Sequence, residues 1–230
     1  MICATRSRPD MTKKMIKSWK DTQSGLSDMV IMLDDDDPEL DKYDVEGVFK
    51  EVTDTARKMV REGGCGIKFP RGSAQLNQKA YEMYPDYKYY GLVGDDTIFR
   101  TKDWDKIVID RFKEVGDFGM IYGDDLGCHK PVMPFITANL IKLVGYLVPP
   151  KFIHMRIDRI WWDITKYSNN IHSVPIVMEH MHPHWGKGEY DDTYDTMRSL
   201  RLDRHDKTAY LLWERDELPK ILDKIKLCIK

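Results

Sequence analysis

The sequence has few cysteines and no strong excess of charge of either sign. Its four cysteines are scattered, with no paired spacing. This argues against a zinc site or a disulfide framework and favours a reducing cytoplasm. The formal net charge of -2 predicts no global attraction to nucleic acid or to an anionic membrane.

Long apolar runs are also lacking. The most apolar region, 131–155, is interrupted by Asn139, Lys142 and the Pro149-Pro150 pair, so it is too broken to span a bilayer. The N-terminus shows no apolar core before a cleavage site, which argues against a signal peptide. We therefore expect a cytoplasmic protein without a membrane partner. With 230 residues, 42% of them hydrophobic and 32% charged, the chain fits one compact domain with a real core.

Apolar strands alternate with helical patterns along the chain. In the first half we expect strands over 2–5, 27–33, 65–69 and 87–93, and helices over 10–24, 45–62 and 72–83. Beyond them we expect helices over 104–115, 138–145, 154–164 and 203–226, the last interrupted at Pro219, and strands over 118–122, 131–136 and 174–179. This alternation predicts an α/β fold, with a mostly parallel, Rossmann-like sheet flanked by helices.

Polar clusters follow the predicted strands of the first half, at the point where each strand ends. They are Thr5 to Arg8, Asp34 to Asp37, Pro70-Arg71, and Asp95-Asp96. Ligands of such sheets bind outside the carboxyl ends of the strands. The four clusters together favour a phosphate- or nucleotide-bearing ligand in one shared crevice.

Asp95 and Asp96 are adjacent carboxylates at the end of a strand. Each raises the pKa of the other unless a cation lies between them, and Mg²⁺ or Mn²⁺ accepts such oxygen ligands. Gly94-Asp95-Asp96 is equally compatible with a hairpin turn that carries solvated aspartates. A second Gly-Asp-Asp at 123–125 is interpreted as a turn.

Asp158 lies on the predicted helix over 154–164. On a helix, His154, Asp158 and Trp162 share a face beside the apolar stripe. Asp158 in a cleft beside aromatic surface would have a raised pKa, which suits a general base. The spacing alone favours another interpretation, an i,i+4 pair of His154 and Asp158 on a solvated surface.

A histidine-rich segment follows the last predicted strand. On an extended chain, His180, His182 and His184 would project to one side, and one of them could complete a metal site begun by Asp96. Lys187 lies between two glycines, a placement that suits a flexible phosphate clamp. The alternative is a solvated histidine-rich loop.

Four segments follow one another in the first half of the chain: the polar turn at 5–8, the acids at 34–37, the segment Arg71 to Ala80 and the segment Gly94 to Phe99. Their order resembles the nucleotide-sugar-binding half of GT-A fold glycosyltransferases, closest to the inverting family 2 type. The resemblance covers about 1–105, whereas 106–190 resembles the smaller, α+β acceptor-side part more loosely, and 191–230 would be a C-terminal helical extension.

The resemblance implies roles for individual residues. In the nucleotide-sugar pocket it places Thr5, Arg6, Arg8, Arg71 and Asn77, with Asp34, Asp35 or Asp36 bonding base or ribose. It implies that Asp95 contacts the ribose and a metal-bound water, that Asp96 binds Mn²⁺ or Mg²⁺ with His180 or His182 as a further ligand, and that Asp158 is the catalytic base. The family often has an acid on each side of a spacer, whereas here Gly94 holds the outer position.

The function implied is metal-dependent, inverting transfer of a sugar from a nucleotide diphosphate sugar, with UDP as the default, to an acceptor hydroxyl. A glycan, a protein, a small molecule and a hydroxymethylated base in phage DNA are all possible acceptors. The acidic net charge argues mildly against DNA. Still, five basic residues could form a local acceptor-side patch: Lys130, Lys142, Lys151, Arg156 and Arg159.

Three alternatives remain. A nucleotidyltransferase would need a glycine-rich phosphate loop, which Arg6 to Pro9 imitates poorly. A non-catalytic nucleotide-sugar-binding module would keep the pocket without needing Asp158. A phosphohydrolase would release phosphate without any acceptor.

Overall fold

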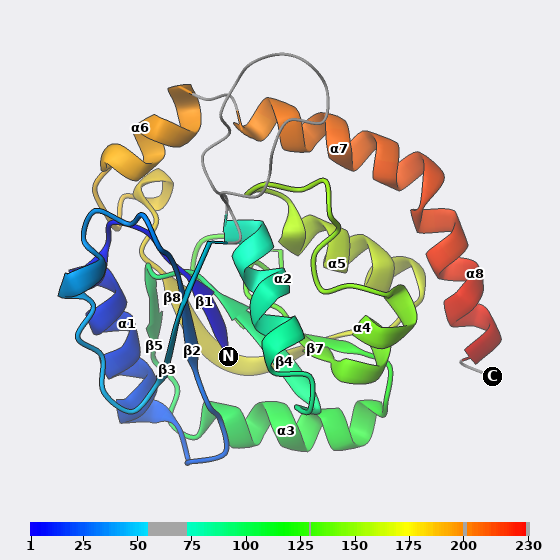
Figure 1. Cartoon of the computed structure of the whole chain (residues 1–230). Helices are drawn as coiled ribbons and strands as arrows, with labels where there is room; N and C mark the ends of the chain where they lie inside the picture. The colour runs from blue at the N-terminus through cyan, green and yellow to red at the C-terminus, as the bar shows by residue number, and fades with distance from the viewer. Residues whose placement is uncertain (55–72, 129, 200–201, 229–230) are drawn as a thin grey trace.

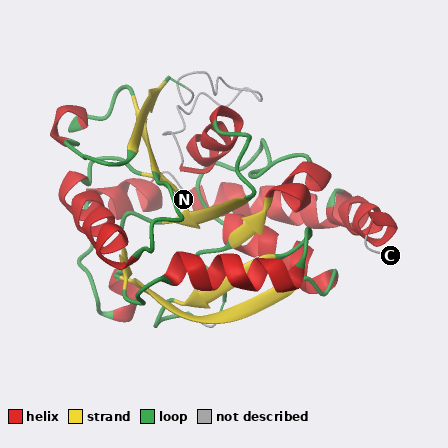
Figure 2. Ribbon diagram, turned by 90° about the horizontal axis from the view of Figure 1, so that it is seen from below, coloured by secondary structure: helices red, strands yellow, loops and turns green. Residues whose placement is uncertain are grey.

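A curled sheet with helices on both sides forms the centre of the molecule (Figures 1 and 2). The computed structural model describes residues 1–54, 73–128, 130–199 and 202–228. Among these residues, the sheet has eight strands in the order β3-β2-β1-β4-β7-β6-β8-β5. The predicted α/β architecture is confirmed.

The first four strands of this order are parallel. They are β1 (Ile2–Ala4), β2 (Val30–Asp34), β3 (Phe49–Thr53) and β4 (Tyr89–Val93). All five residues of β2 are buried, as expected for a parallel strand covered on both faces. The connecting helices are α1 (Pro9–Thr22) and α2 (Ser73–Met83). Because the strands are parallel, their carboxyl ends meet at one edge of the sheet.

The other half of the sheet mixes directions. Its strands are β5 (Thr97–Phe99), β6 (Met120–Asp124), β7 (Phe135–Thr137) and β8 (Ile171–His180). Strand β7 runs antiparallel to both β4 and β6, β6 is parallel to β8, and β5 is antiparallel to β8. The helices of this half are α3 (Trp104–Val115), α4 (Ala138–Val144) and α5 (Ile157–Tyr167).

Side chains that alternate along the strands feed two apolar cores. Val30 and Met32 join one core, whereas Ile31 and Leu33 join the other, because successive strand residues point to opposite faces. The first core also holds residues of α2, α4 and α5, and the second holds residues of α1 and α3. Two sheet faces with covering helices therefore fix the positions of the strand ends.

The chain closes with helices α6 (Asp192–Ser199), α7 (Leu202–Asp216) and α8 (Leu218–Cys228), of which α7 and α8 run along the flank beside α5 in Figure 1. Trp213 and Ile221 are buried in the first core. Short 3₁₀ helices occupy Leu40–Lys42 (η1) and Pro183–Trp185 (η2). No helix in the described ranges combines the length and the apolar character that a membrane crossing requires.

Three sequence predictions need correction. The helix over 45–62 is wrong in its described part, because Phe49–Thr53 pairs with β2 as a strand. The single helix over 203–226 is two helices, and Pro219 lies in the first turn of the second, where its missing N–H costs nothing. The strand over 131–136 shrinks to β7, which begins at Phe135. The predicted strand over 65–69 lies outside the described residues.

Candidate active site

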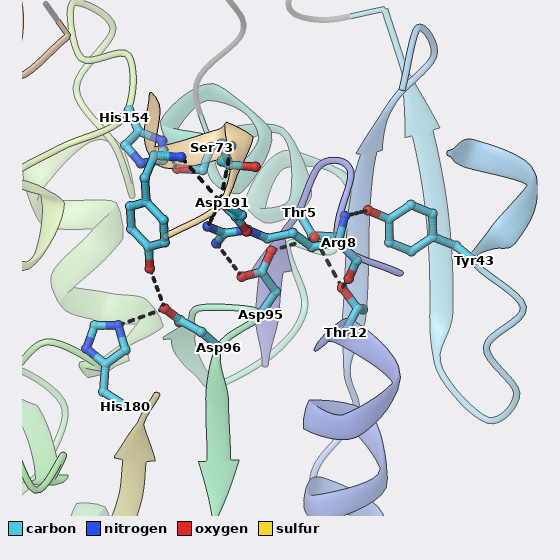
Figure 3. A network of polar contacts seen from close by, with 12 residues as sticks. Thr5, Arg8, Thr12, Tyr43, Ser73, Asp95, Asp96, His154, His180 and Asp191 are labelled. Atoms are coloured by element: carbon cyan, nitrogen blue, oxygen red, sulfur yellow. Dashed lines mark hydrogen bonds and ion pairs between the residues drawn. The ribbon is translucent and has the colours of Figure 1, made fainter. Parts of the chain in front are cut away.

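The end of β1 connects to the end of β4 through buried side chains (Figure 3). The Thr5 hydroxyl donates to Oδ2 of Asp95 at 2.6 Å, and it lies 3.1 Å from the hydroxyl of Thr12 on α1. The backbone N–H of Arg8 donates to the Tyr43 hydroxyl at 2.9 Å. The predicted meeting of the first strand end with the aspartate pair is therefore present in the fold.

The Arg8 guanidinium is the hub of this network. Its Nε and Nη2 donate to the two carboxylate oxygens of Asp191 at 2.7 and 2.8 Å, a bidentate geometry, and its Nη1 donates to Oδ1 of Asp95 at 3.1 Å. The guanidinium also lies 4.6 Å from the ring centroid of Tyr194. Arg8 thereby ties the end of β1 to β4 and to the start of α6.

Asp95 and Asp96 are adjacent but have opposite pKa shifts. Burial disfavours the charged form of Asp95 and, with the repulsion of Asp96, outweighs Arg8 and Thr5 to raise the pKa of Asp95 to about 6. Burial also acts on Asp96, but the hydrogen bond with His180, together with the electrostatic effects of His180, Arg8 and His182, outweighs it and lowers the pKa of Asp96. The two carboxylates therefore offer different chemistry at one strand end.

The antiparallel pairing of β5 with β8 brings His180 to Asp96. Thr97 is in register with His180, and His180 Nε2 lies 3.1 Å from Oδ2 of Asp96. The Tyr194 hydroxyl donates to the same oxygen at 3.3 Å. A Cβ on Gly94 would lie 2.5 Å from Oδ1 of Asp96, so glycine at the outer position of the motif leaves room for this carboxylate.

The histidine segment does not stay extended after β8. His182 caps η2, where its Nδ1 accepts from the N–H of His184, and the ring of His184 packs against Trp185. The rings of His180 and His182 are 5.1 Å apart. The prediction that the three histidines project to one side is wrong, because the chain turns at His182. Across the described part of the chain, no three His, Cys, Asp or Glu residues are grouped closely enough to hold a metal ion.

The predicted nucleotide-pocket residues lie beside the network at the ends of β1 and β2. Arg6 forms ion pairs with Asp36 at 2.6 Å and with the buried Asp34 at 3.5 Å. Asp35 donates its backbone N–H to the Thr53 carbonyl. The Asp37 carboxylate accepts from the N–H of Ser7. Acids after β2 therefore face the basic turn after β1, as their order in the sequence predicts.

Two other predicted residues, Asn77 and Lys187, stand apart from this network. Asn77 lies on α2, and its Oδ1 is buried without a hydrogen-bond partner among the described residues. Lys187 donates to the Leu126 carbonyl and pairs with Glu179, both at 3.0 Å, rather than with Asp95 or Asp96. Arg71 lies outside the described residues.

Asp158 lies in the first turn of α5 and lines a cavity of about 400 Å³. Burial raises the pKa of Asp158, which makes the carboxylate a better proton acceptor. The predicted surface pair with His154 is wrong, because His154 precedes the helix and its Nδ1 lies 3.0 Å from the Ser73 hydroxyl. Burial also lowers the pKa of His154.

The loop before α5 is fastened by a buried carboxylate of α7. Asp206 accepts hydrogen bonds from the N–H groups of Ile153, His154 and Met155 at 3.1, 2.8 and 2.6 Å. The C-terminal helices therefore help to position Asp158.

Sequence reasoning missed Asp125, Asp191 and Tyr194. Asp125 is buried at the end of β6, and its Oδ2 lies 4.0 Å from Nδ1 of His180. The second Gly-Asp-Asp was its signal. Asp191 caps α6 through the N–H groups of Thr193 and Tyr194 while it holds Arg8. No local sequence pattern pointed to Asp191 or Tyr194.

No protein-family model and no curated protein sequence matches the chain. Among solved structures, residues 1–349 of S. aureus TarS match with 12% identity and a TM-score of 0.55, covering 97% of this chain and 69% of that one. The mannosyltransferase PcManGT from Pyrobaculum calidifontis, in complex with GDP-Man and Mn²⁺, matches with 9% identity and a TM-score of 0.58, covering 98% and 72%. Glucosyl-3-phosphoglycerate synthase from Mycobacterium tuberculosis, in complex with Mn²⁺, UDP and phosphoglyceric acid, matches with 9% identity and a TM-score of 0.57, covering 89% and 75%. The chain therefore has the GT-A fold of nucleotide-sugar glycosyltransferases.

Proposed function

We propose that the protein is a metal-dependent, inverting glycosyltransferase that moves a sugar from a nucleotide diphosphate sugar to an acceptor hydroxyl. The observation that carries this proposal is the meeting of Asp95 and Asp96 with Thr5, Arg8 and His180 at the carboxyl ends of the strands. The solved structures of the same fold support it, since they include complexes with GDP-Man and Mn²⁺ or with UDP and Mn²⁺.

Asp96 and His180 are the residues that would hold the metal ion. Their ligand atoms, Oδ2 and Nε2, are 3.1 Å apart and converge on one region. A carboxylate with an imidazole suits Mn²⁺, and Mg²⁺ also accepts the carboxylate. Two protein ligands leave the other positions to water and to the donor's phosphates. When bound, the ion would neutralise charge on the leaving diphosphate.

The donor's nucleotide would lie over the ends of β1 and β2. There Thr5, Arg6 and the acids Asp34 to Asp36 would bind base and ribose, and Asp95 would bind the ribose. Arg8 would contact the diphosphate once Asp191 releases it. Asn77 is a candidate for the base pocket, because its buried Oδ1 lacks a partner among the described residues. The donor-binding part would be 1–105 and the acceptor-side part 106–190.

Asp158 would remove the proton of the acceptor hydroxyl. Burial raises its pKa, and it lines a cavity with room for an acceptor. Attack from the face opposite the leaving diphosphate would invert the anomeric centre.

A thermal-shift screen tests this function. UDP, GDP and their sugar conjugates would be added with and without Mn²⁺, and we expect stabilisation that requires both nucleotide and metal. A ligand at a hundred times its Kd stabilises by about 2.7 kcal/mol. Asp96→Asn should remove the metal-dependent part, whereas the exposed control Asp117→Asn should keep it. If no nucleotide stabilises the wild-type protein, the proposal is wrong.

Product analysis separates the alternatives. A nucleotidyltransferase would release pyrophosphate from a nucleoside triphosphate, and a phosphohydrolase would release phosphate without acceptor. A non-catalytic module would bind the sugar nucleotide without consuming it.

A further inference from the structure

The cavity at the start of α5, here called the α5 cavity, is built from three separate segments. Lys130 and Pro131 come from the loop after β6, Asp158 and Trp162 come from α5, and Glu214 comes from α7. Its volume of about 400 Å³ is within the range of small-ligand sites. The cavity thus places a carboxylate with a raised pKa beside both basic and aromatic side chains.

Arg156 is the most unusual residue of the α5 cavity. Its φ is +74°, a left-handed conformation that is strained for a residue with a side chain. Its Nη2 donates to Asp203 at 2.8 Å, but its Nε is buried without a hydrogen-bond partner among the described residues. A buried N–H without a partner is costly, and more so on a charged group. Arg156 therefore lines the cavity with a guanidinium whose Nε–H has no acceptor among the described residues.

Lys130 adds a second positive charge. Against the burial that raises the pKa of Asp158, both Lys130 and Arg156 act electrostatically on this carboxylate, so the two cations lie near it. Lys130 is exposed, and no ion pair is seen for it within the described residues. An anion held by these two cations would lie beside the proposed catalytic base.

The overall charge of the α5 cavity limits the size of that anion. Its three basic residues, Lys130, Arg156 and Arg159, are matched by Asp158, Asp203 and Glu214. A balanced wall can hold one anionic group at a local cationic spot, but it would repel a strand with a phosphate at every nucleotide. Trp162 supplies a flat apolar wall, which suits the face of a sugar ring or another flat surface.

We propose that the acceptor is a small hydroxylated compound that carries a phosphate group, which the guanidinium of Arg156 and the amine of Lys130 bind while the acceptor hydroxyl faces Asp158. This inference rests on the proposed function and names its acceptor class. In the transfer step, the acceptor oxygen forms a bond to the anomeric carbon as the bond from that carbon to the nucleotide diphosphate breaks. The diphosphate leaves with the electron pair, and the hydroxyl proton passes to the Asp158 carboxylate.

Matched pairs of phosphorylated and neutral compounds test the proposal. Glucose 6-phosphate and glucose, and glycerol 3-phosphate and glycerol, would be titrated calorimetrically into the whole 230-residue chain, with and without UDP and Mn²⁺. We expect each phosphorylated compound to bind at least about tenfold more tightly than its neutral partner, the effect of one charge-assisted hydrogen bond. Equal affinities within both pairs would overturn the proposal.

Variants locate the binding. Arg156→Gln and the exposed Lys130→Gln should each remove most of the discrimination between phosphorylated and neutral compounds. Lys142→Gln, which removes an exposed charge outside the cavity, and Arg8→Gln, which alters the strand-end network, should both keep it. Loss of discrimination in Arg8→Gln alone would place the phosphate at the strand ends and overturn the proposal. Lys130→Gln keeps the test valid if Arg156→Gln fails to fold.

A single-stranded DNA 20-mer serves as the competing acceptor. Tighter binding of this probe than of glucose 6-phosphate, lost in Arg156→Gln, would overturn the proposal in favour of a nucleic-acid acceptor. The experiment separates this inference from the proposed function, because the UDP and Mn²⁺ thermal shift is measured independently. If that shift is absent, the donor chemistry is wrong, while phosphate binding without UDP still tests the α5 cavity.

Discussion

The strand-end network and the α5 cavity treat their charged groups differently. At the strand ends, Arg8 is bound by Asp191 and Asp95, and Asp96 is bound by His180 and Tyr194. In the α5 cavity, Arg156 keeps a buried N–H without a described partner, and Asp158 is desolvated. A ligand at the strand ends must therefore replace internal contacts, whereas a ligand in the α5 cavity adds contacts that are missing.

The largest expected effect is on the cavity side. Asp158→Asn should lower kcat by about a hundred- to ten-thousand-fold, the usual contribution of a positioned general base. The UDP and Mn²⁺ thermal shift should be unchanged. In the wild type, kcat/KM should fall as pH drops through the pKa of Asp158, which burial holds above 3.8, because the base must be ionised. Loss of nucleotide binding in this variant would contradict the separation of the two regions, and the exposed Asp110→Asn serves as control.

The second effect concerns the stability of the network. The folded pKa of Asp95 is about 6, above its ordinary value of 3.8, so the folded state keeps a proton that the unfolded state has lost. Ionisation therefore destabilises the fold as pH rises from about 4 through 6, by at most about 3 kcal/mol. Asp95→Asn should lack this loss, so its stability relative to wild type should increase from pH 4 to pH 8. Urea unfolding in the presence of EDTA measures the free energy of unfolding of both proteins at each pH. If this free energy changed equally with pH in the variant and the wild type, Asp95 would be solvated in the folded protein.

The smallest effect should come from releasing Arg8. Asp191→Asn keeps a side chain that caps α6 but removes the negative charge. Asp191 is partly exposed, so its ion pair with Arg8 contributes only modest stabilisation. UDP should therefore bind about threefold more tightly in the presence of Mn²⁺, because a smaller fraction of the variant protein keeps Arg8 bound to residue 191. Titration calorimetry against the exposed Asp192→Asn decides it, and weaker binding would mean that Asp191 contacts the nucleotide.

Features that are set by residues adjacent in the sequence, such as buried strands and the polar residues that follow them, could be predicted. The run 29–33 is apolar because β2 is buried on both faces, and the acids that follow it lie where predicted. The segment 45–53 misled because Val48, Phe49 and Val52 also fit a helical spacing. Phe49 and Val52 are in fact substantially exposed on the edge strand β3, and the Phe49 ring packs against Tyr84.

Contacts between distant residues were beyond local patterns. Arg8 and Asp191 are separated by 183 positions, and the sequence around each residue does not predict a contact with the other. Asp125 was interpreted as a turn residue, and its Oδ1 does accept the turn N–H groups of Gly127 and Cys128. Its second oxygen reaches toward His180 only because β6 and β8 pair in parallel. Strand order, rather than composition, decides this contact.

Asp206 has a consequence for how the protein is made. Its carboxylate holds the N–H groups of 153–155, which precede it by 51 to 53 positions. During synthesis from the N-terminus, the strands β1 to β4, whose ends carry the network, are made well before α7. The loop that sets the proposed base must wait for that helix. A nascent chain arrested before residue 206 should therefore bind the nucleotide, but it should not yet catalyse transfer.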